Sequence, residues 1–120
     1  MQILDLEHAP SSPIDSRGTK HELFHEKRLG LELNINRLRA GSESGRYHLH
    51  KKSDSVYVVL EGKARFMVNG TNYDLSKHSA IFLEKNEPHS IANGGDLDLL
   101  IVELYVPENP DFTLIELTQS

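Results

Sequence analysis

Hydrophobic and polar residues alternate along much of this chain in short segments. Between Leu29 and Asn36 every second residue is Leu or Ile, and the residues between them are Gly, Glu or Asn. A period of two is typical of a β-strand whose two faces have different surroundings. Further apolar or alternating segments, separated by turn residues, follow at Tyr47–His50, Val56–Leu60, Arg65–Val68, Thr71–Leu75, Ala80–Leu83, Pro88–Ala92 and Leu97–Val106.

The spacing of these segments predicts the fold class. Asn69-Gly70 separates two of them by two residues and predicts a β-hairpin with a type I′ turn. Short strands at regular spacing, without a convincing long helix, are typical of an antiparallel sandwich or barrel. We therefore expect an all-β protein.

The beginning of the chain has a different character. Residues 1–20 are polar and contain two prolines and a glycine, so we interpret them as an extended N-terminal arm in which Ile3–Leu6 is the candidate for one short strand. Residues 21–120 then form a single domain, because 120 residues suffice for one domain and not for two of ordinary size.

One predicted strand is apolar at every position. Val56–Leu60 reads Val-Tyr-Val-Val-Leu, so both of its faces are expected to lie away from water. In a single small domain the outer face of such a strand needs a cover, and the polar arm offers little apolar surface. We therefore expect a homodimer packed sheet on sheet.

Composition excludes several classes of function. A net charge of −5 gives no basic surface for nucleic acid or for an anionic membrane, and no apolar run approaches the ~20 residues that span a bilayer. The chain has no cysteine, hence no disulfide and no thiolate ligand or nucleophile. Its first residues lack the features of a secretion signal, so the cytoplasm is the expected compartment.

The seven histidines are the unusual feature of this composition. His48 and His50 are two residues apart, so on a strand both imidazoles point to the same face. His89 follows Pro88 on a later strand, and in a closed sheet all three rings could meet at one interior point. Three imidazoles with an open coordination position suit zinc, iron, copper or nickel.

The segments around these histidines resemble the two motifs of the cupin superfamily. Residues 45–62, GRYHLHKKSDSVYVVLEG, resemble the first motif, in which His-x-His and Glu are separated by three or four residues, and Glu and a following Gly by six. Residues 78–93, HSAIFLEKNEPHSIAN, resemble the second motif, which ends in His, three residues and Asn. The resemblance implies an antiparallel jelly-roll β-barrel with the motifs at 45–93, and it implies His48, His50 and His89 as metal ligands.

The first motif departs from the family pattern at its carboxylate. Ser55 stands where the family has its glutamate ligand. Asp54 fits the looser spacing, but a shift of one residue turns a side chain to the opposite face, so Asp54 would need a local bulge to become a fourth ligand. Ser55 would border the vacant coordination position, and Tyr57, which shares its parity, is a candidate pocket contact or a core tyrosine.

The resemblance implies two functions from different classes. The first is an enzyme with one divalent transition metal (Fe, Zn, Ni, Cu or Mn) that acts on a small anionic or oxygenated metabolite, with dioxygenase-like or isomerase- or lyase-like chemistry. Three neutral imidazoles leave the full charge on the ion, which strengthens its pull on anions. The second is a non-catalytic cupin that binds a sugar or a small acid and whose metal site has decayed.

A competing motif lies earlier in the chain. His21–His25 reads His-Glu-Leu-Phe-His and matches the zincin protease signature, which requires a helix so that both histidines share one face. The third ligand has no convincing match downstream. We therefore interpret this segment as a strand or turn with solvated histidines, and a helix over residues 20–29 would favour the protease.

Overall fold

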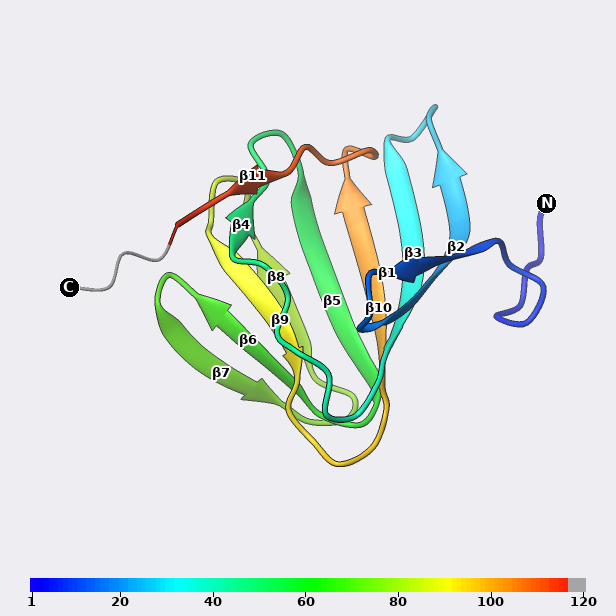
Figure 1. The fold of residues 1–120 in the computed structure, drawn as a ribbon. Coiled ribbons are helices and arrows are strands. Elements are labelled where there is room, and N and C mark those ends of the chain that lie inside the picture. The colour runs from blue at the N-terminus through cyan, green and yellow to red at the C-terminus, as the bar shows by residue number, and fades with distance from the viewer. Residues whose placement is uncertain (117–120) are drawn as a thin grey trace.

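The computed structural model describes residues 1–116, which form two antiparallel β-sheets and no helix (Figure 1). The first sheet has the order β1-β2-β3-β10-β5-β8. Its strands are β1 (Ser11–Ile14), β2 (Gly18–Glu26), β3 (Leu31–Leu38), β10 (Leu99–Val106), β5 (Asp54–Glu61) and β8 (Ala80–Leu83). The second sheet, of order β11-β4-β9-β6-β7, contains β11 (Thr113–Leu114), β4 (His48–Leu49), β9 (His89–Asn93), β6 (Ala64–Val68) and β7 (Thr71–Leu75).

The prediction of an antiparallel all-β fold is confirmed, with one correction to its shape. The two sheets are separate and face each other as a sandwich, so the structure is not a closed barrel (Figure 1). Each strand predicted between Tyr47 and Val106 has its counterpart in the structure, and the hairpin at Asn69-Gly70 joins β6 to β7, with both turn residues at positive φ.

The N-terminal arm is more ordered than the sequence indicates. Ile3–Leu6 contains no strand; the short strand of this region is β1, which pairs with β2. β2 begins at Gly18, so its pairing with β3 crosses the predicted boundary between residues 20 and 21. An edge strand such as β1 is exposed on both faces and tolerates Pro13, which explains why it lacks an apolar pattern. The division into an arm and a domain stays a prediction, and its last residues, 117–120, lie outside the described range.

The apolar core fills one end of the sandwich. It consists of buried side chains from both sheets, namely Leu38, Tyr57, Val59, Ala64, Phe66, Val68, Leu83, Leu99 and Ile101. Along β10 the inward residues change from Leu99 and Ile101 to Glu103 and Tyr105. The interior is therefore apolar at one end of this strand and polar at the other.

The alternation of β3 has the opposite orientation to that of an ordinary half-buried strand. Its polar residues Glu32, Asn34 and Asn36 are buried, whereas Leu33 and Ile35 are only half-buried on the outer face. A period of two shows that the faces differ, and it does not show which face points inward. Here the inward face borders a polar interior.

Candidate metal site

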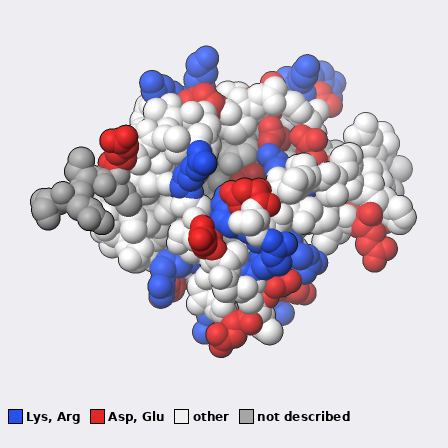
Figure 2. All heavy atoms as spheres, viewed as in Figure 1, with Lys and Arg blue, Asp and Glu red and all other residues white. Residues whose placement is uncertain are grey.

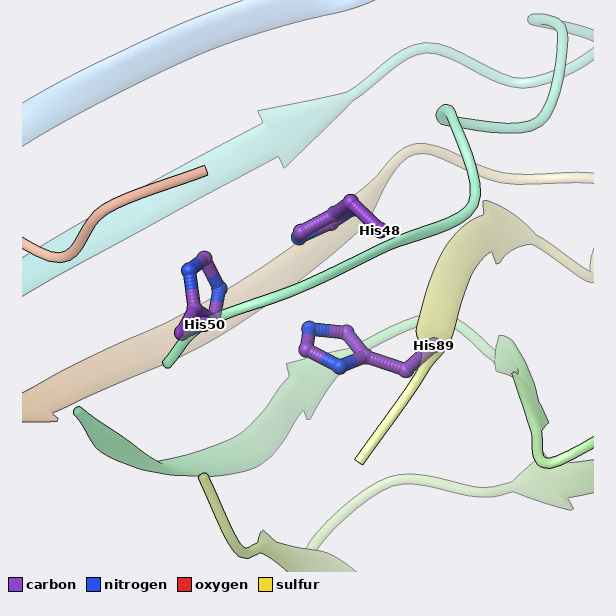
Figure 3. A group of neighbouring side chains, drawn as sticks. All are labelled: His48, His50 and His89. Atoms are coloured by element: carbon purple, nitrogen blue, oxygen red, sulfur yellow. The ribbon is translucent and has the colours of Figure 1, made fainter. Parts of the chain in front are cut away.

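His48, His50 and His89 meet at the polar end of the sandwich (Figure 3). His48 lies on β4 directly opposite His89 on β9, and His50 directly follows the end of β4. One ring nitrogen from each residue lies within 4.8 Å of the others, and the ring centroids are 4.5 to 5.3 Å apart. The three side chains form what we call the histidine cluster.

Backbone carbonyl groups fix the orientation of all three imidazoles. The Nδ1–H of His48 donates to the carbonyl oxygen of Arg46 over 2.8 Å, and that of His89 to the carbonyl oxygen of Glu87 over 2.9 Å. The Nδ1–H of His50 donates to the carbonyl oxygen of Asp111. A carbonyl can only accept, so each Nδ1 carries the proton and each Nε2 keeps its lone pair.

The free nitrogens of the cluster suit a metal ion. His50 and His89 are 4% and 1% exposed, and the Nε2 atom of each is buried without a hydrogen-bond partner. A buried acceptor without a partner is costly, and a metal ion would relieve that cost. Burial lowers the pKa of His48 to about 4 and lowers the pKa of His89, so these two rings are neutral at pH 7. The residues present therefore fit a bound cation.

The C-terminal segment supports the cluster, and sequence analysis did not assign it a role. Besides the carbonyl that holds His50, the Asp111 carboxylate accepts hydrogen bonds from the backbone N–H groups of Lys51 and Lys52. Phe112 stacks on His48, with ring centroids 4.2 Å apart and an interplanar angle of 21°. The apolar residues of this segment are visible in the sequence, but they do not indicate where in the fold the segment lies.

The remaining predicted site residues lie outside the cluster. Asp54 does not join it, because its carboxylate accepts a hydrogen bond from the backbone N–H of Lys85. Ser55 and Tyr57 point inward and are 2% and 1% exposed. Tyr57 lines a cavity of about 560 Å³ that also reaches His48 and His50, and its hydroxyl lies 3.2 Å from that of Tyr105.

The cavity is also lined by carboxylates that sequence analysis missed. Glu32 on β3 and Glu103 on β10 are both buried and both line the cavity. Glu32 falls on the polar parity of β3, which in an ordinary half-buried strand faces solvent.

The zincin-like segment is not a helix. Residues His21–His25 lie within strand β2, as the strand interpretation expected. The Nε2 of His25 lies 2.6 Å from a carboxylate oxygen of Glu108, and among residues 1–116 the structure gives no group of three ligands that includes this pair. The protease hypothesis is therefore wrong.

Comparison with known proteins establishes the family. The sequence pattern of the cupin domain matches residues 35–105, which is more than half of the chain. The chain therefore belongs to the cupin domain family, and its two-sheet fold is the jelly roll that the motifs implied.

The chain is also similar in sequence to two individual proteins. The chain is 29% identical over 107 residues to an oxalate-binding protein of Thermotoga maritima, a match that covers 82% of this chain and 88% of the relative. It is also 29% identical over 55 residues to an uncharacterized protein of Methanocaldococcus jannaschii, but this match spans less than half of either protein (46% and 44%).

Solved structures show the same fold at low sequence identity. KdgF from Halomonas sp. superposes with a TM-score of 0.81 at 17% identity, covering 90% of this chain and 96% of that one. A predicted oxalate decarboxylase from Thermotoga maritima gives a TM-score of 0.80 at 20% identity, covering 88% and 99%.

Proposed function

We propose that this protein binds one divalent transition-metal ion through His48, His50 and His89 and is an enzyme that acts on a small anionic or oxygenated metabolite. The observation that carries the proposal is the shared orientation of the three rings, whose Nδ1–H groups all donate to carbonyls. The Nε2 atoms of His50 and His89 are buried without partners, and His48 and His50 line a cavity large enough for a small molecule.

The bound ion would supply Lewis acidity or a site for dioxygen. The donor set is of imidazole only, because Ser55 replaces the family's glutamate and Asp54 lies elsewhere. Such a set favours Fe, Zn, Ni or Cu over Mn, which prefers oxygen donors. Tyr57 and Phe112 line the cavity and would provide aromatic surface against a bound metabolite.

Elemental analysis of the purified protein, produced without a polyhistidine tag, tests the metal site. We expect close to one equivalent of metal in the unmodified protein and substantially less in His89→Ala. His8→Ala, at an exposed position of the N-terminal arm, is the matched control and should retain the metal. Equal metal content in His89→Ala and the unmodified protein would contradict the proposal.

The alternative is a non-catalytic cupin that binds a sugar or a small acid. It predicts a protein whose thermal stability does not respond to added Fe, Zn, Ni, Cu or Mn. A metal at 100 times its dissociation constant would stabilise the fold by about 2.7 kcal/mol, which a melting curve detects. The oxalate-binding name of the Thermotoga maritima relative is compatible with either function.

Two features of the structure concern membranes and nucleic acids. Residues 1–116 contain no helix long and apolar enough to cross a membrane. Basic and acidic side chains are interspersed on the face seen in Figure 2, so that face has no continuous basic surface for a nucleic-acid backbone. A cytoplasmic location and a homodimer stay predictions.

A further inference from the structure

The cavity has a second set of hydrogen-bond acceptors besides the histidine cluster. Glu32, Asn34 and Asn36 on β3 and Glu103 on β10 point inward and are 4%, 0%, 8% and 6% exposed. We call these four residues the acceptor wall; Glu32, Asn36 and Glu103 line the cavity, and Asn34 lies between the two carboxylates. Asn34 lies opposite Glu103 in the strand register, and its Nδ2 donates to both Glu32 (2.9 Å) and Glu103 (3.1 Å).

Glu32 is well compensated within the protein. Besides Asn34, it accepts a hydrogen bond from the backbone N–H of Asn109 over 3.0 Å and lies 3.6 Å from the Nζ of Lys20. Burial raises the pKa of Glu32, but these bonds and the charge of Lys20 outweigh burial and hold the pKa below its ordinary value. Glu32 is therefore an ionised carboxylate whose partners are already present.

Glu103 has far less compensation. Among residues 1–116 it forms no ion pair; it accepts a hydrogen bond from Asn34 over 3.1 Å, and its other hydrogen-bonding neighbours are neutral hydroxyl groups. Its neighbours include the hydroxyl groups of Tyr57 and Tyr105, whose pKa values are raised by burial and then by the charge of Glu103. A buried carboxylate without a cation is costly, and an apolar residue at this position would serve folding better.

Asn36 provides an independent indication of a ligand. It lines the same cavity, and its Oδ1 is buried without a hydrogen-bond partner. Asn36 lies on β3 two residues from Asn34, on the same inward face as Glu103 of the neighbouring strand. The wall thus presents to one cavity a carboxylate that has no ion-pair partner among the described residues and an unpartnered amide oxygen.

We propose that the ligand of this cavity carries hydrogen-bond donors, either hydroxyl or ammonium groups, that bind Glu103 and Asn36. This inference rests on the proposed function, since it places the oxygenated or anionic end of the same ligand at the histidine cluster. Donors match the acceptors of the wall, whereas a small dicarboxylate without donors would bring a like charge toward Glu103. The substrate class is therefore a hydroxylated or amino-bearing acid.

The acceptor wall is not a second metal site. The Nδ2 of Asn34 donates to both carboxylates and so occupies the space between them. No group of three potential ligands other than the histidine cluster occurs among residues 1–116. A donor group of an organic ligand is the partner that fits these acceptors.

A matched series of linear acids tests this inference. The probes are carboxylic acids of about three to six carbons that end in methyl, hydroxyl or ammonium, so the terminal group is changed while the carboxylate is kept. Dissociation constants are measured by calorimetry for the unmodified protein, Glu103→Gln and Glu61→Gln, with and without bound metal. Glu61 is exposed and does not line the cavity, so its substitution controls for net charge.

We expect at least one hydroxyl- or ammonium-terminated acid to bind about tenfold or more tightly than its methyl-terminated analogue, as hydrogen bonds to charged groups allow. Glu103→Gln should abolish most of an ammonium preference and reduce a hydroxyl preference, which distinguishes the two donors. Glu61→Gln should leave both unchanged. Because the amide oxygen introduced by Glu103→Gln can still accept from Asn34, the variant is expected to fold, and circular dichroism checks this.

Two results would overturn the inference. One is equal affinity for the three terminal groups, or no binding of any probe; the other is a donor preference that Glu103→Gln leaves intact. Metal content is measured on the same samples. A protein that retains metal but shows no donor preference refutes only this inference, whereas one that never binds metal refutes the proposed function.

Discussion

At the scale of single residues, the fold keeps the imidazoles of His48 and His89 neutral. The neutral form favours metal binding, but it lowers the stability of the metal-free protein at acidic pH. Burial of His48 and His89 lowers their pKa values and disfavours their protonated forms, whereas in an unfolded chain both rings take up a proton near their ordinary pKa. The unfolded state therefore binds more protons as the pH falls, which lowers the free energy of unfolding.

This difference predicts an acid-sensitive stability. In metal-free protein the contribution of His48 to the free energy of unfolding is fully present above pH 6.5. It is lost as the pH falls toward about 4, which is the pKa of His48 in the folded state. Urea unfolding across this range should show a smaller loss of stability in His48→Gln than in the unmodified protein. His8→Gln, at an exposed position, should retain the full loss. Identical pH profiles for all three proteins would show that His48 is not the responsible group.

A second prediction concerns the glycine that ends the first cupin motif. Gly62 and Gly70 both have φ of 83°, but a Cβ at Gly62 would lie 2.7 Å from the carbonyl oxygen of Asp98, whereas one at Gly70 would meet nothing within 4 Å. Gly70→Ala should cost about 1 kcal/mol from backbone strain alone. Gly62→Ala should cost about 1–3 kcal/mol more because of the added contact. Chemical denaturation measures both, and equal losses would show that the backbone relieves the contact.

At the scale of elements, the C-terminal segment connects the edge of the second sheet to the histidine cluster. β11 pairs with β4 of the same chain, and the residues just before it hold His50 and the backbone after it. The apolar residues of such a segment do not by themselves indicate whether it covers its own chain or a partner. The structure places it on its own sheet.

This arrangement predicts that Asp111 positions the cluster without contacting the metal. Asp111→Ala removes the acceptor of the Lys51 and Lys52 N–H groups and should loosen the loop that carries His50. We expect a metal affinity about tenfold weaker, at the lower end of the effects of residues that orient ligands. Competition with a chelator measures this affinity. Asp96→Ala, at an exposed site, should change nothing, and unchanged affinity in Asp111→Ala would remove it from this role.

The sequence predicted the positions of the strands better than it predicted which strand faces point inward and what they contact. The strands between Tyr47 and Val106 follow from local apolar patterns and turn residues, which act over a few positions. The inward orientation of Glu32 and the meeting of Glu103 with Asn34 depend on strand pairings between residues far apart in the chain. Neither can be derived from a local pattern, because a polar interior reverses the usual meaning of alternation.

At the scale of the whole molecule, the outer face of the first sheet is apolar across its centre. Apart from Arg37 and Asp54 near the strand ends, the half-buried outward residues of the three central strands are aliphatic, namely Leu31, Leu33, Ile35, Val56, Val58, Leu60, Leu100, Val102 and Leu104. In the register, Val102 lies between Ile35 on β3 and Val58 on β5. A continuous apolar surface of this kind on a single chain is typical of an interface.

We therefore expect two copies to pack through this face, as the apolar strand at Val56–Leu60 predicts. Light scattering should give about twice the chain mass of 13.6 kDa at micromolar concentration. Val102→Lys would place a charge at the centre of the interface and should reduce the mass to that of one chain, because burying an unpaired ammonium opposes association. Asn72→Lys, on the exposed strand β7 of the other sheet, adds the same charge and should leave the mass unchanged. A mass of one chain for the unmodified protein would show that this face stays uncovered in solution.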